Sequence, residues 1–308
     1  MAIAIVVVLL IVGSTVFHFM SPWWFTPLAS NWGSIDDTIM LTFWITGVVL
    51  IAINLFMAYA IWRYRYQKDR RAEYEPENKK LEGWLIGLTT LGVVAMLAPG
   101  LIVWADFVTV PEDAHVFEVM GQQWQWSYRY PGRDGILGTT DNKYVDFDNP
   151  FGIKPDDPYG QDDILVQSDE VHVPIDQPVK VLLRSLDVLH DFYVPNFRAK
   201  MDLVPGLITY FWFTPTKIGS YEVLCAELCG QGHYAMRGIV VVDEQIEFEA
   251  WLAEQPTFAQ SMALARAPGT DGQEQTASAQ SVASISADYK ISDEQLNLLN
   301  AYLDSSLE

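Results

Sequence analysis

The sequence predicts an α+β membrane protein, in which two or three N-terminal transmembrane helices precede an external β domain. Three apolar runs lie before residue 110, and each is close to the roughly 20 residues that a helix needs to cross a bilayer. After residue 111 the chain changes to short runs of alternating apolar and polar residues, which are typical of half-buried strands. The two patterns therefore predict two structurally different parts.

Residues 2–20 form the first apolar run, and two interpretations of it stay open. It is either a retained membrane span or a secretory signal. A signal would begin with basic residues, but no Lys or Arg occurs before Arg63. The Ser-Pro-Trp-Trp-Phe sequence at 21–25 is typical of an aromatic belt at a membrane surface. We therefore assign residues 1–37 to a first span and an external loop, with the signal as the alternative.

Residues 38–110 predict a transmembrane helical hairpin. Its apolar runs, 38–62 and 84–108, flank a loop at 63–80 that is rich in Lys and Arg. Basic residues concentrate in cytoplasmic loops, so this loop is expected in the cytoplasm. Everything after residue 111 then lies outside the membrane.

The charge balance restricts the possible partners. The chain has 39 acidic and 19 basic residues, a formal net charge of −20. Nucleic acid is excluded as a partner because its phosphates need basic patches, whereas a basic protein would be attracted over long distances. The Asp-rich residues 131–163 predict a loop region with turns. Its charge serves either solubility or the docking of a basic protein.

The only two cysteines lie in a short loop between two strand-like runs. Cys225 and Cys229 are followed by His233 and Met236, and such sulfur and imidazole donors suit copper. A mononuclear blue-copper site uses one cysteine, so two thiolates four residues apart could bridge two copper ions. A disulfide or a zinc site is the alternative. The disulfide would leave His233 and Met236 unexplained, and methionine is a poor zinc ligand.

A second histidine, His190, ends the segment Asp-Val-Leu-His. This segment and the later Cys-x-Glu-x-Cys-x-x-x-His-x-x-Met resemble subunit II of the haem–copper cytochrome c oxidases, and the resemblance covers about residues 35–255. It implies a cupredoxin-like Greek-key β-sandwich at 111–255 that carries the binuclear centre CuA, with two copper ions per chain. It also implies a magnesium ion at the boundary with subunit I, reached by the Glu227 side chain. The copper ligands that it implies are His190, Cys225, the carbonyl of Glu227, Cys229, His233 and Met236.

We call residues 225–236 the metal loop. The resemblance also gives roles to two residues outside this loop. In the aromatic run at 121–130, Trp124 would be the first electron acceptor, with Trp126 and Tyr128 packed beneath it. Glu82 would lie at the mouth of a proton channel into subunit I. The tryptophan that follows Glu82 is out of register with related sequences, and an ordinary carboxylate at the membrane surface is the alternative.

The function implied by the resemblance is electron input to a respiratory terminal oxidase. Cytochrome c or a similar basic donor would reduce CuA, which would pass electrons to haem in subunit I for oxygen reduction and proton pumping. Subunit III is a further expected partner. The location implied is a bacterial-type inner membrane, multi-pass and surrounded by lipid, with the CuA domain on the periplasmic side. The alternatives are a CuA subunit of a nitric oxide reductase, a membrane-anchored copper-binding module, and a quinol oxidase subunit, which would lack the ligands.

The last residues differ in composition from the β domain. Residues 256–290 are rich in Ala, Ser, Gln, Thr and Gly and predict a flexible linker. Residues 291–308 predict a short helix, because a capping box begins at Ser292. No cysteine follows Cys229, so the Cys-x-x-Cys-His motif of covalently bound haem c does not occur.

Overall fold

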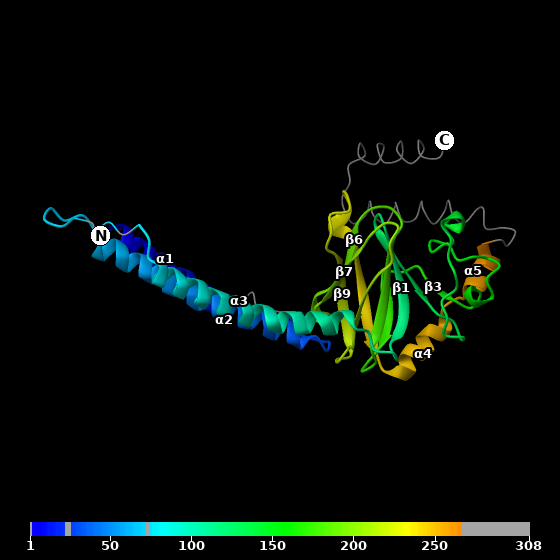
Figure 1. The fold of residues 1–308 in the computed structure, drawn as a ribbon. Coiled ribbons are helices and arrows are strands. Elements are labelled where there is room, and N and C mark those ends of the chain that lie inside the picture. The colour runs from blue at the N-terminus through cyan, green and yellow to red at the C-terminus, as the bar shows by residue number, and fades with distance from the viewer. Residues whose placement is uncertain (1, 22–25, 72–73, 75, 266–308) are drawn as a thin grey trace, which may run out of the picture.

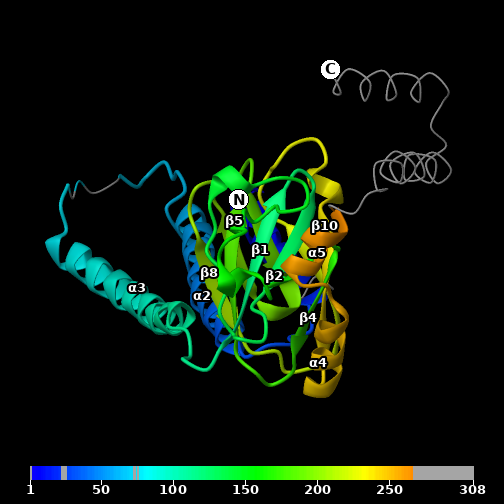
Figure 2. The ribbon, with the colours of Figure 1, turned by 90° about the vertical axis from the view of Figure 1, so that its right-hand side faces the viewer.

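A computed structural model of the chain describes residues 2–21, 26–71, 74 and 76–265 (Figure 1). Three long helices project from one end of a β domain (Figures 1 and 2). Three predictions lie outside the described residues: the aromatic belt at 22–25, the linker beyond residue 265, and the terminal helix at 291–308.

The three helices match the three apolar runs. They are α1 (Ala2–Met20), α2 (Gly33–Arg63) and α3 (Lys79–Val108), and each is long and apolar enough to span a membrane. Helix α3 begins several residues before the apolar run, because the side chain of Asn78 accepts a hydrogen bond from the Leu81 N–H (3.0 Å) and caps the helix. The most apolar stretches of α2 and α3 have no residue buried within the chain. These faces are therefore free for lipid or for helices of other subunits.

The β domain consists of two five-stranded sheets. The first has the order β3-β2-β1-β5-β8 and the second β4-β10-β9-β6-β7. Strands β1 and β5 run parallel, as do β4 and β10, and the other neighbours are antiparallel. The strands are β1 (His115–Gln122), β2 (Gln125–Tyr130), β3 (Ile164–Val166), β4 (Glu170–Pro174), β5 (Val179–Ser185), β6 (His190–Val194), β7 (Ala199–Leu203), β8 (Thr209–Phe213), β9 (Gly219–Cys225) and β10 (Arg237–Asp243).

The inward-facing residues of both sheets form one core. Val119, Val181 and Leu183 of the first sheet and Phe192 and Val223 of the second are fully buried. In β5 the buried residues alternate with the half-buried Lys180, Leu182 and Arg184, and a core shared by the inner faces of two sheets is typical of sheets packed face to face. The predicted β-sandwich is confirmed.

Residues 116–130, which include the aromatic run and whose alternating pattern is typical of a single strand, form a hairpin. It turns between β1 and β2 at Gln123 and Trp124, and Gln122 faces Gln125 across the turn. The alternation of the sequence continues through this two-residue turn, so the pattern alone does not reveal the reversal. Trp124 therefore lies at the rim of the domain.

The β domain is fixed to the membrane helices by residues at the start of α2. Trp32 is buried against Trp212 and Phe107, and its indole N–H donates to the Trp212 carbonyl (2.8 Å). Arg198 makes a two-pronged ion pair with Asp36, at 2.7 and 2.9 Å, and such paired contacts fix orientation as well as distance. The start of α2, the end of α3 and strand β8 are thus held together.

The described part of the predicted linker is helical. After α4 (Gln245–Glu254), a second short helix, α5 (Phe258–Ala265), packs on the β domain. Phe258 is buried with Phe151, Ile153 and Leu165, and its N–H donates to the Asp163 carbonyl (2.7 Å). The linker expected from residue 256 is wrong for these residues. The polar composition does not reveal helix α5, because one aromatic residue is sufficient to anchor a two-turn helix.

We predict that Phe258→Ala detaches α5 and loosens the loop region beneath it. Deleting a buried aromatic ring costs about 3–5 kcal/mol, and a terminal helix can open without unfolding the sandwich. Hydrogen exchange of the amides at 149–166 should become faster. Leu264→Ala, on an exposed part of the same helix, is the control. Equal protection in the two variants would contradict this account.

Candidate metal centre

The loop between β9 and β10 carries most of the predicted ligands. Cys225 is the last residue of β9, and the short helix η4 (His233–Ala235) precedes Met236. The Cys225 N–H donates to the Met236 carbonyl (3.2 Å) and closes the base of the loop. His190 begins β6, which pairs with β9 through Phe192 opposite Cys225. Strand pairing therefore brings the distant histidine to the loop.

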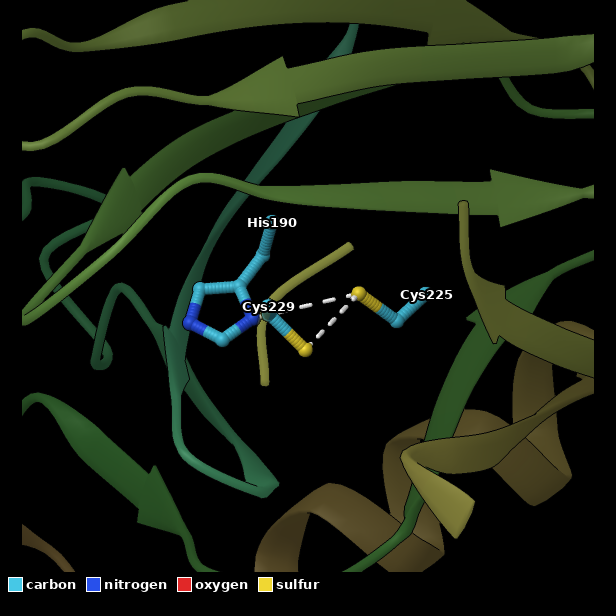
Figure 3. A group of neighbouring side chains, drawn as sticks. All are labelled: His190, Cys225 and Cys229. Carbon is cyan, nitrogen blue, oxygen red and sulfur yellow. Dashed lines mark hydrogen bonds between the residues drawn. The ribbon is translucent and has the colours of Figure 1, made fainter. Parts of the chain in front are cut away.

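Two thiols and one imidazole meet at the centre of the site. Figure 3 shows His190, Cys225 and Cys229 gathered with their side chains close together. The Cys225 Sγ atom lies 3.6 Å from the Cys229 Sγ and 3.8 Å from the His190 Nδ1. All three residues are buried. Both thiols are free, so the disulfide alternative is not what the structure shows.

The remaining predicted ligands lie around the same two thiols. The Cys229 Sγ is 3.6 Å from the His233 Nδ1 and 3.9 Å from the Met236 Sδ. The Cys225 thiol donates to the Glu227 carbonyl (3.2 Å). Each cysteine thus has two donors of its own, and the structure brings all six predicted ligands together.

The donor chemistry fits copper better than the alternatives. Thiolates, imidazoles and a thioether are the set that copper sites use. Structural zinc takes four donors from Cys, His and carboxylates in a closed tetrahedron, which would leave the thioether of Met236 without a purpose. His190 and the Glu227 carbonyl lie beside Cys225, and His233 and Met236 lie beside Cys229.

Charge also favours positive ions at the thiol pair. Burial acts to raise the pKa of Cys225, but hydrogen bonds with His190 and with the backbone outweigh it and lower this pKa to about 6. Burial, together with the hydrogen bond and charge of Cys225, raises the pKa of Cys229 to about 12. Two thiolates 3.6 Å apart repel each other, so the doubly ionised pair needs metal ions to balance it.

Asp187 orients His190 and is a functional residue that we did not single out from the sequence. Its Oδ1 lies 2.8 Å from the His190 Nε2. A proton on Nε2 leaves the lone pair of Nδ1 directed toward Cys225, which is the usual way a carboxylate prepares a histidine ligand. The available signal was the position of Asp187 three residues before His190. We treated it only as part of a motif.

Trp124 lies at the surface beside the metal loop. Its exposed fraction is 43%, whereas Trp126 is 2% exposed and Tyr128 is fully buried. The Trp126 ring packs edge-on against His190, with 6.3 Å between centroids. The amide of Gln123 donates to the Cys229 carbonyl (2.7 Å). The hairpin turn is thus hydrogen-bonded to the loop that holds the cysteines.

The two remaining predicted positions are Glu82 and the side chain of Glu227. Glu82 is in the first turn of α3, at the end of that helix far from the β domain (Figure 1). The structure does not bring it near the metal loop. The Glu227 side chain interacts electrostatically with Lys200. Lys200 also forms an ion pair with Asp191, at 3.2 Å.

Comparisons with known proteins indicate the family of the chain. Residues 115–244 match the family described as cytochrome c oxidase subunit II, periplasmic domain. The chain is 59% identical over 259 residues to an alternative cytochrome c oxidase subunit 2 of Bradyrhizobium diazoefficiens, covering 84% of this chain and 94% of the relative. It is 28% identical over 242 residues to the cytochrome c oxidase subunit 2 of Cereibacter sphaeroides, covering 74% and 77%.

A solved structure is also similar over the β domain. It is the periplasmic domain of subunit II of cytochrome oxidase from Bradyrhizobium japonicum, with 28% sequence identity and a TM-score of 0.35, covering 47% of this chain and 95% of that chain. The family match and the high identity to a relative covered almost in full decide the assignment. This chain belongs to the cytochrome c oxidase subunit II family, whose members are part of haem–copper terminal oxidases and whose external domain is implied to bind copper.

Proposed function

We propose that this chain is the electron-input subunit of a respiratory terminal oxidase in a bacterial-type inner membrane. It would hold two copper ions, take electrons from cytochrome c or a similar basic donor, and deliver them to haem in subunit I. Oxygen reduction and proton pumping would follow in the partner subunit. The observation that supports this most is the gathering of four further donors around the two thiols.

The proposed ligands fall into two sets that share Cys225 and Cys229. His190 and the Glu227 carbonyl would serve one ion, and His233 and Met236 the other. Copper, when bound, would supply a centre that accepts and releases one electron at a time. The protein provides a buried and closely braced frame for it, since strand pairing, the loop-closing hydrogen bond and Asp187 fix the donors in advance.

We assign Trp124 as the first electron acceptor. It is the exposed aromatic residue of the β1–β2 turn, and its neighbour Gln123 is hydrogen-bonded to the carbonyl of a ligand. Flat, exposed tryptophan rings are favoured at protein interfaces. The net charge of −20 would attract a basic donor.

The remaining assignments concern the partner subunits. The unburied apolar faces of α2 and α3 are suited to contact with subunit I and lipid, with subunit III as a further proposed partner. Glu82 is proposed at the mouth of a proton channel, and the Glu227 side chain as a contact to magnesium at the subunit I boundary. Nitric oxide reductase and copper-storage roles have no observation in their favour, since the similar proteins of Bradyrhizobium diazoefficiens and Cereibacter sphaeroides are both oxidase subunits.

We predict that Cys229→Ser abolishes the paired copper site. With one thiolate left, the electron paramagnetic resonance spectrum should change from that of an electron shared by two copper nuclei to that of a single copper, and copper per chain should fall. Met120→Leu replaces a buried methionine outside the loop and should leave the spectrum intact. If the spectrum of the unmodified protein shows an electron on a single copper nucleus, the binuclear site is rejected.

We predict that Trp124→Ala slows electron transfer from cytochrome c and leaves copper content unchanged. The ring contributes the surface through which the donor reaches the loop, and it is not a ligand. Stopped-flow reduction of the copper centre in the oxidase complex measures this rate. Tyr66→Ala, an exposed aromatic change on the cytoplasmic loop, is the control. A normal rate in Trp124→Ala would remove this residue from the path.

We predict that Glu82→Gln slows oxygen consumption by the complex while its copper spectrum stays normal. A carboxylate at the membrane surface can exchange protons with water, and glutamine cannot. Glu77→Gln, a nearby change in the exposed loop before α3, is the matched control. Equal turnover in both variants would leave Glu82 as an ordinary surface carboxylate.

A further inference from the structure

The metal loop contains two glycines with different backbone requirements. Gly230 has φ +127°, a conformation that side-chain-bearing residues rarely adopt. Gly232 has φ −84° and ψ 6°, which other residues adopt as well. The backbone therefore explains glycine at 230 but not at 232.

The indole of Trp124 explains glycine at 232. A Cβ atom on Gly232 would lie 2.6 Å from the Trp124 Cγ and 2.8 Å from its Cε3, far inside contact distance. These atoms belong to the base of the ring, so a small rotation of the ring tip would not relieve the overlap. At Gly230 a Cβ would meet the Trp124 Cζ2 at 3.1 Å. The ring thus lies along the bare backbone from Gly230 to Gly232.

Gln123, the residue before Trp124, is hydrogen-bonded to the same loop. Its side-chain amide donates to the Cys229 carbonyl (2.7 Å), and its backbone N–H donates to the Asp187 Oδ2 (2.7 Å). Asp187 in turn holds His190. The residue before Trp124 is therefore tied to both chain segments that carry the proposed ligands.

We propose that Gly232 is a positioning residue for electron input, because it lets the Trp124 ring rest directly on the backbone between Cys229 and His233. This inference rests on the proposed function. One electron leaves the reduced donor and one arrives at the oxidised copper pair, with no bond made or broken. Because Gly232 has no side chain, no atoms lie between the Trp124 ring and the backbone of the loop that carries the proposed ligands. The hydrogen bonds of Gln123 hold the ring in this contact.

A double-mutant cycle in the oxidase complex tests the proposal. Gly232→Ala should slow copper reduction by saturating soluble cytochrome c at least about tenfold, since displacements near 1 Å can have such effects, while KM changes little. In the Trp124→Ala background the same change should have no further effect, because the ring it displaces is gone. Equal losses in both backgrounds, or no loss in either, would overturn the proposal.

A second measurement reports the ring position without copper or activity. The full chain is labelled with 5-fluorotryptophan, and the fluorine resonance of Trp124 is assigned by its loss in Trp124→Phe. Gly232→Ala should shift this resonance, and Gln231→Ala, at an exposed neighbour, should not. If the Trp124 resonance does not move in Gly232→Ala, the proposal that Gly232 positions the Trp124 ring is rejected.

Copper content and the electron paramagnetic resonance spectrum of each variant distinguish failure of the proposed function from failure of the positioning role of Gly232. If the unmodified chain lacks the paired copper signal, the proposed function fails, whereas the fluorine shift still tests the contact between Gly232 and Trp124. If copper is normal and the fluorine resonance does not move, the positioning role alone fails.

Discussion

The pairing of β6 with β9 is the contact on which the site depends. It places His190, the first residue of β6, beside Cys225, the last residue of β9, although 35 positions separate them. The core between the sheets holds both strands, with Phe192 and Val223 fully buried. The metal loop has little structure of its own apart from one helical turn. Its donors are fixed because the ends of the loop are strands in a packed sheet.

The same domain is braced against the membrane helices. The ion pair between Arg198 and Asp36 and the packing of Trp32 on Trp212 join the sandwich to the start of α2. Partly buried, two-pronged ion pairs specify geometry more than they add stability. If the chain delivers electrons to a neighbouring subunit, as we propose, these contacts set the position of the loop between β9 and β10 relative to the membrane helices.

The sequence was sufficient to predict the three apolar helices and the sandwich, and the ligands that we propose from it lie together in the fold. Periodicity and length identify helices and strands, and cysteine spacing identifies the loop, whereas the family resemblance identified His190. Four features were not predicted from the sequence. The hairpin at Trp124 was hidden because alternation continues through a two-residue turn. Helix α5 was hidden because Phe258 is a single anchor in a polar composition. Asp187 and Gly232 escaped because their roles depend on side chains that only the fold brings near.

In the proposed copper centre, one pair of thiolates bridges two copper ions. X-ray absorption at the copper edge of the copper-loaded full chain tests it most directly, because it reports the atoms around each ion. We expect sulfur and nitrogen neighbours at every copper and a second copper in the next shell. Sulfur and nitrogen neighbours without copper–copper scattering would contradict the account, and would mean that Cys225 and Cys229 hold a single ion.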